Sequence, residues 1–219
     1  DDASIAWQVD LGSTKSARST PVLVDVDLDG TTEIVVVYDT ESSLNVDVWS
    51  PELTCDESGW QTGGHSNEVE WSWSDSDLRI GITSPHAPTR ESNHLSVTQP
   101  LLADLELDGQ PELVLSVVDV SSDDPQIMSI PLGSSAPTEP NWEVILDRGT
   151  HPSDPAWAQL DDSNTAVIAT TIDENSGNMW IWRLDGTTGS NSWGRVAVTG
   201  TDTDSDSPRL RLPSPVITQ

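Results

Sequence analysis

Apolar and polar residues alternate along much of this chain with a period of two, which is the period of a half-buried β-strand. The alternation appears first in residues 5–10 and again in residues 44–49, where Leu44, Val46 and Val48 stand between polar residues. No stretch shows the 3.6-residue period of an amphipathic helix. The pattern therefore predicts an all-β fold with almost no helix.

The predicted strands fall into groups of four, and each group opens with a short strand that begins at a proline. The groups span residues 21–73, 100–146 and 155–198, with an outer strand before them at 5–10 and the start of a further group at 213–219. A tryptophan-bearing strand precedes each opening proline, at Trp7, Trp71, Trp142 and Trp193. Four-stranded antiparallel units repeated at this spacing are typical of β-propeller blades.

This pattern predicts one repeat domain over residues 1–219, with about three complete blades plus flanking strands. Closed propellers have roughly four to eight blades, so the chain is expected to be a propeller or a partial propeller. It can be a piece of a longer propeller, one of several chains that assemble a ring, or an open arc. We favour the first interpretation. An open arc would leave strand edges unpaired and would invite self-association.

An acidic loop separates the first two strands of the first group. It offers oxygen ligands from four carboxylates and one backbone carbonyl: Asp25, Asp27, Asp29, Thr31 (the carbonyl) and Glu33. A hard cation such as Ca²⁺ takes roughly six to eight oxygen ligands, and carboxylates two residues apart on a tightly curled loop can converge on it. Gly30 permits the reversal that such a curl needs. The alternative is an acidic surface turn without metal, but charges this close repel unless a cation neutralises them.

The same pattern returns between the first two strands of the second group. The corresponding ligands are Asp104, Glu106, Asp108, Gln110 (the carbonyl) and Glu112. Residues 155–164 form a third copy that keeps the strands and loses most of the ligands, which indicates an empty or weak site. An EF-hand is excluded because the twelfth position of the first loop is Val36, where that motif needs a carboxylate.

The motif D-x-D-x-D-G-x-x-E before an apolar run resembles the calcium-loop repeats of the FG-GAP and VCBS type, which occur in integrin alpha-subunit heads and in many secreted microbial proteins. The resemblance implies a β-propeller in which each loop joins the first two strands of a blade and binds Ca²⁺. Residues 184–189 followed by Trp193 are similar to repeats of the quinoprotein type.

The charge of the chain narrows the classes of partner. Asp and Glu number 37 against 9 Lys and Arg, for a formal net charge of −28. Such a surface repels nucleic acid and anionic membranes, and no apolar run reaches the ~20 residues of a membrane-spanning helix. The charge suits a halophilic or marine microbe, because high salt screens self-repulsion, and it equally suits an ordinary acidic secreted calcium binder.

The longest predicted loops, residues 51–67 and 74–98, hold the candidate ligand-binding residues Trp60 and His65. Long loops on a rigid scaffold often carry binding residues. The tryptophan pairs Trp71/Trp73 and Trp180/Trp182 each share one face of a strand, and we expect them to pack in the core.

The sequence holds no nucleophile elbow, phosphate-binding glycine loop, zinc spacing or Ser-His-Asp order. We therefore expect a non-catalytic, calcium-binding propeller segment, extracellular or at the cell surface, that serves adhesion or the recognition of a protein or carbohydrate ligand. Two alternatives remain open. One is the scaffold part of a secreted polysaccharide-active or quinoprotein-like enzyme, and the other is a surface-layer or filament subunit.

Overall fold

The computed structural model describes residues 16–17, 19–40, 43–50, 54–56, 59–61, 69–80, 99–122, 124–149, 151–173 and 178–198. Regular structure in these residues consists of β-strands, all paired antiparallel, and the described part of the chain contains no helix. The described residues therefore include no helix that is long and apolar enough to cross a membrane. The predicted all-β fold is confirmed.

The first sheet is an antiparallel meander. Its strands are β1 (Ser16–Ala17), β2 (Val22–Val24), β3 (Glu33–Asp39), β4 (Leu44–Trp49) and β7 (Val69–Asp75). Their order is β1-β3-β4-β7, with β2 also paired to β3. The short strand β2 pairs with the beginning of β3, and β1 pairs with its end. Both lie on the same side of β3, so the sheet is four strands wide and the two short strands together form its first strand.

The second and third sheets have the same order of strands. The second contains β8 (Leu78–Ile80), β9 (Leu101–Ala103), β10 (Glu112–Asp119), β11 (Pro125–Pro131) and β12 (Trp142–Ile145). The third contains β13 (His151–Pro152), β14 (Ala156–Asp161), β15 (Asn164–Asp173), β16 (Asn178–Asp185) and β17 (Asn191–Val198). In both, two short strands again share the position beside the long second strand.

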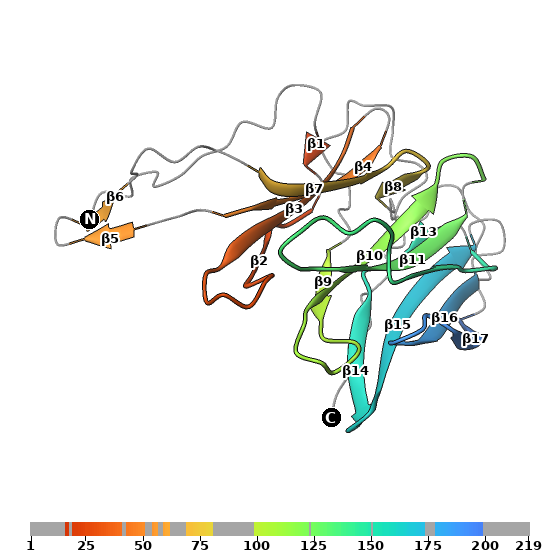
Figure 1. The fold of residues 1–219 in the computed structure, drawn as a ribbon. Helices are drawn as coiled ribbons and strands as arrows, with labels where there is room; N and C mark the ends of the chain where they lie inside the picture. Colours follow the sequence, from red (N-terminus) through yellow and green to blue (C-terminus); the bar gives the residue numbers. More distant parts are fainter. Residues whose placement is uncertain are drawn as a thin grey trace.

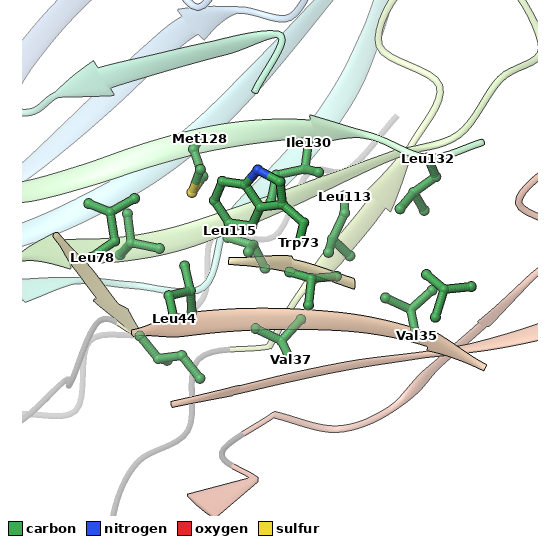
Figure 2. Packing of buried hydrophobic residues seen from close by; sticks show 14 of the residues in the cluster. Val35, Val37, Leu44, Trp73, Leu78, Leu113, Leu115, Met128, Ile130 and Leu132 are labelled. Carbon is green, nitrogen blue, oxygen red and sulfur yellow. The ribbon is translucent and has the colours of Figure 1, made fainter. Parts of the chain in front are cut away.

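The second sheet lies between the other two, and the core is correspondingly in two parts (Figure 1). Along β10, Leu113 and Leu115 contribute to a cluster shared with the first sheet, and Val114 contributes to a cluster shared with the third. Figure 2 shows the first cluster, in which Trp73 of β7 packs among Met128 and other side chains of the second sheet. This alternation explains why β10 is buried on both faces.

A tryptophan ties each sheet to the next. Trp71 on β7 donates its indole N–H to the carbonyl of Gly133, which follows β11, at 2.8 Å. Trp142 on β12 donates in the same way to Gly186, which follows β16, also at 2.8 Å. The fourth strand of one sheet is thus bonded to the end of the third strand of the next.

The structure corrects the sequence prediction in the connecting segments. Strand β8 lies within the predicted loop 74–98, and β5 (Thr54–Asp56) pairs with β6 (Gly59–Gln61) within the predicted loop 51–67. Strands β1, β8 and β13 extend the sheets beyond the predicted group boundaries. All have two or three residues, too few to establish a period of two. The predicted strands at 5–10 and 213–219 lie outside the described residues.

Candidate metal centre

The first acidic loop connects β2 to β3 and curls tightly. Leu28 has φ of 60° and Gly30 has φ of 93°, both in the left-handed region. Glycine adopts this region readily, whereas a leucine there is uncommon and must be held by its surroundings. Specific hydrogen bonds must therefore hold the loop in this shape, because Leu28 does not favour this backbone conformation by itself.

Those bonds come from the aspartates themselves. The two oxygens of Asp25 accept the backbone N–H groups of Asp29 at 3.0 Å and Gly30 at 2.9 Å. The carboxylate of Asp27 accepts the same Asp29 N–H at 3.2 Å, and that of Asp29 accepts the N–H of Thr31 at 2.7 Å. The backbone thereby wraps around the carboxylates and turns them toward the inside of the curl.

The three aspartates meet the geometric requirement for one cation. A ligand oxygen from each of Asp25, Asp27 and Asp29 lies within 4.8 Å of the other two. Oxygens bound to one Ca²⁺ at about 2.3–2.6 Å are at most about 5 Å apart, so these carboxylates can share an ion with little rearrangement. At this range each pair of like charges repels by roughly 1 kcal/mol in water-like surroundings, and a bound cation would remove that cost.

Glu33 closes the loop from β3. Its side chain is only 3% exposed, and its Oε2 accepts the N–H of Val26 at 2.9 Å. Burial raises the pKa of the Glu33 carboxyl, and the nearby negative charges of Asp27, Asp25 and Asp29 raise it further. Glu33 thus lies near enough for its pKa to respond to the three aspartates, but it is not part of the group whose ligand oxygens lie within 4.8 Å of one another.

The second loop, between β9 and β10, repeats most of these features at the corresponding residues. Leu107 and Gly109 have φ of 57° and 89°. The oxygens of Asp104 accept the N–H groups of Asp108 at 3.0 Å and Gly109 at 2.9 Å, and Asp108 accepts that of Gln110 at 2.8 Å. Figure 1 shows the two loops at the same end of their sheets.

Glu112 takes the place of Glu33 in the second loop. Its Oε2 accepts the N–H of Leu105 at 2.6 Å, and its side chain is 3% exposed. Burial, followed by the charges of Glu106, Asp104 and Asp108, raises the pKa of Glu112 to about 7. Within the described residues, however, only the first loop brings three carboxylates within 4.8 Å of one another, and Glu106 is exposed.

The raised pKa of Glu112 makes the stability of the metal-free protein depend on pH. Below 4.5, its ordinary pKa, the carboxyl is protonated in the folded and the unfolded chain alike. Between 4.5 and about 7 the unfolded chain ionises while the folded protein keeps the proton, so stability falls as pH rises. Melting temperatures in chelator should decline across this window, and Glu112→Gln should make the decline shallower. An unchanged slope in the variant would contradict this assignment.

The third loop is reduced to a tight hairpin between β14 and β15. Asp161 accepts hydrogen bonds from the N–H of Ser163 at 2.9 Å and from the amide nitrogen of Asn164 at 2.7 Å. These bonds lower the pKa of the Asp161 carboxyl. The loop's own donors satisfy this carboxylate, and among the described residues it belongs to no group of three possible ligands.

One carboxylate near the first loop was missed by the sequence analysis. Burial raises the pKa of Glu70 on β7, and the charges of Glu33, Asp27 and Asp29 add to the effect. Glu70 is far from the loop in sequence and reaches its vicinity only through the pairing of β7 with β4, so no local motif indicated it.

The structure does not describe the side chain of either candidate ligand-binding residue. Trp60 lies on β6, paired with Cys55, and its side chain is not among those described; His65 lies outside the described residues. Trp71, Trp73 and Trp182 are buried in the core, as expected, and Trp180 stacks on Trp182 at 6.3 Å between ring centres.

No family model, curated protein or solved structure matches the chain. The resemblance to FG-GAP and VCBS repeats therefore rests on the loop residues alone.

Proposed function

We propose that the chain is a calcium-stabilised, non-catalytic segment of an extracellular β-propeller that serves adhesion or the recognition of a protein or carbohydrate ligand. The observation that carries the proposal is the pair of acidic loops. They stand at the same place in two sheets, with the same left-handed leucine, the same glycine and the same carboxylate-to-backbone bonds. The cation is Ca²⁺, because the donors are carboxylate and carbonyl oxygens on a loop, the set that Ca²⁺ prefers.

The propeller assignment is supported by the arrangement of the sheets. Three meanders with one strand order follow each other along the chain and pack face to face in succession. Propeller blades are four-stranded meanders with this relation to their neighbours. In such a blade the metal loop joins the first two strands, where a bound ion would cross-link them and cancel local repulsion. The extracellular assignment is supported by the resemblance of the two loops to the calcium-loop repeats of secreted proteins.

Calcium is expected to raise the melting temperature of the protein above its value in chelator. At about 100 times the dissociation constant, one site adds about 2.7 kcal/mol. A domain of this size changes by about 2–4 °C per kcal/mol, so one filled site should give roughly 5–11 °C. Mg²⁺ should give less, because it demands a smaller octahedral site. A melting curve that is the same with calcium and with chelator would count against the proposal.

Recognition and catalysis are distinguished by whether a bound polysaccharide stays intact or is cleaved. A panel of acidic and neutral polysaccharides incubated with the calcium-loaded protein should yield binding without new reducing ends. Cleavage products in such an incubation would instead support a polysaccharide-active enzyme.

A further inference from the structure

One residue of the second acidic loop is held by hydrogen bonds from its own loop and from the neighbouring sheet. Leu105 stands between the candidate ligands Asp104 and Glu106. Its N–H donates to Oε2 of Glu112 at 2.6 Å, within the loop. Its carbonyl accepts the hydroxyl of Thr165, also at 2.6 Å, and Thr165 belongs to β15 of the third sheet. The peptide groups that join Leu105 to the two candidate ligands are thus each fixed by a hydrogen bond.

The side chain of Leu105 is anchored at the same interface. It is 1% exposed and packs in the cluster between the second and third sheets, together with Val167 and Leu184. Because a buried carbonyl that loses its donor costs free energy, the Leu105 carbonyl depends on Thr165 to keep this position. The third sheet therefore holds the middle of a loop whose candidate ligands all belong to the second sheet.

Thr165 is itself fixed by the third sheet. Its side chain is 3% exposed, and its carbonyl accepts the N–H of Gly186 at 3.0 Å. A Cβ at residue 186 would overlap the Thr165 hydroxyl, so glycine at that position makes room for it. The carbonyl of the same glycine accepts the indole N–H of Trp142 at 2.8 Å. A continuous series of hydrogen bonds thus links the second acidic loop to the tryptophan that joins the two sheets.

The first acidic loop cannot have the same connection. Val26 is its counterpart of Leu105 and belongs to the cluster shared with the second sheet. By the register of the strand pairs, the residue of the second sheet that corresponds to Thr165 is Pro111. Proline has no hydroxyl and no N–H, so Pro111 cannot donate a hydrogen bond to the Val26 carbonyl. The two loops share a ligand pattern and differ in what the neighbouring sheet supplies.

We propose that Thr165 is a positioning residue for the calcium site of the second loop, so that calcium binding there and the packing of the third sheet stabilise each other. The proposal rests on the calcium binding proposed above. Partners that orient the ligands of a metal site typically contribute about 10–100-fold to metal affinity. Thr165 acts through the Leu105 peptide rather than on a ligand directly, so we expect the lower end of that range. Coupling between two sites is reciprocal, so calcium should strengthen the Thr165 contact by the same factor.

Calorimetric titration with Ca²⁺ tests the proposal in two backgrounds that each keep one loop. Asp27→Ala leaves the second loop intact, and Asp108→Ala leaves the first. Thr165→Val removes the hydroxyl at nearly constant side-chain volume, and it should weaken calcium binding about tenfold in the Asp27→Ala background. In the Asp108→Ala background it should have no effect. Thr165→Ser should restore the affinity, because serine returns the donor.

Thr171→Val is the matched control. Thr171 lies on the same strand, has a fully buried side chain, and donates its hydroxyl to the Arg148 carbonyl at 2.6 Å, outside the acidic loops. The substitution should lower the melting temperature in chelator and leave the calcium affinity of the second loop unchanged. If Thr165→Val and Thr171→Val weakened calcium binding equally, the effect would come from general stability, and the positioning role would be wrong.

Amide hydrogen exchange tests the coupling without a change at Thr165, in case Thr165→Val does not fold. In the Asp27→Ala protein, saturating calcium should slow exchange of the Gly186 N–H, which is bonded to Thr165, by about tenfold. The N–H of Asp185 is bonded to Ser190 at 2.9 Å within the same hairpin and should slow less. An equal change at the two amides, or no change at either, would overturn the proposal.

The titrations separate the role of Thr165 from calcium binding itself. No calcium binding in the Asp27→Ala background would overturn this proposal, and none in either background would overturn the proposed calcium function as well. Calcium binding in the Asp27→Ala background that Thr165→Val leaves unchanged would overturn the role of Thr165 alone.

Discussion

Replacing both Asp27 and Asp108 by alanine should remove most of the calcium-dependent rise in melting temperature. Each substitution deletes one carboxylate from one acidic loop, and a cation that loses a charged ligand loses both a bond and Coulomb energy. With two sites filled at about 100 times their dissociation constants, the wild type should gain about 5 kcal/mol. The measurement is the difference between melting in calcium and in chelator for wild type, for both single variants and for the double variant.

The third loop supplies the control for these substitutions. Asp161 is an exposed aspartate at the corresponding connection, and its own hairpin satisfies it. Asp161→Ala should leave the calcium-dependent rise unchanged. A double variant that keeps the full rise, or an Asp161→Ala variant that loses it, would show that calcium stabilises the protein from some other place.

Trp142→Ala should lower the free energy of unfolding by about 3–5 kcal/mol, the range for truncating a buried aromatic side chain. Trp142 is 8% exposed, packs in the cluster between the second and third sheets, and donates to the Gly186 carbonyl at 2.8 Å. Natural domains are stable by only about 5–15 kcal/mol, so this loss is large. Urea denaturation in chelator measures it without a contribution from metal.

Trp142→Phe separates packing from hydrogen bonding at the same position. Phenylalanine keeps much of the apolar contact and leaves the buried Gly186 carbonyl without its indole donor, at a cost of about 1–3 kcal/mol. If Trp142→Ala cost less than about 1 kcal/mol, the sheets would not depend on this tryptophan.

The acidic loops were the most predictable part of the molecule, because everything that shapes them is local. The carboxylates that bind the loop backbone lie two to five residues from the N–H groups they accept, as with Asp25 and Gly30. Glu33 reaches the N–H of Val26 across seven residues of the same loop. A short motif therefore contains nearly all of the site, and its spacing carries over unchanged to the second loop.

The main strands were predictable for a similar reason. Runs such as β10 and β15 have seven or more residues, enough for an apolar pattern to show. The short strands β1, β8 and β13 form only because a long neighbour, β3, β10 or β15, offers them a free edge to pair with. Their existence depends on the assembled sheet rather than on their own residues, so the sequence alone did not indicate them.

Contacts between distant segments were also beyond the sequence pattern. Glu70 comes near the first acidic loop through strand pairing, and the carbonyls of Gly133 and Gly186 receive tryptophan N–H groups from other sheets. The recurring tryptophans were visible as a repeat, but a backbone carbonyl has no signature in sequence. Only the packed sheets show what these tryptophans bind.

The most direct test of the calcium site is an anomalous difference map from crystals grown in saturating Ca²⁺. We expect one peak within about 2.3–2.6 Å of oxygens from Asp25, Asp27 and Asp29, and a second in the loop of Asp104 and Asp108. A map with no peak at either loop, while the carboxylates remain ordered, would contradict the proposed role of the acidic loops.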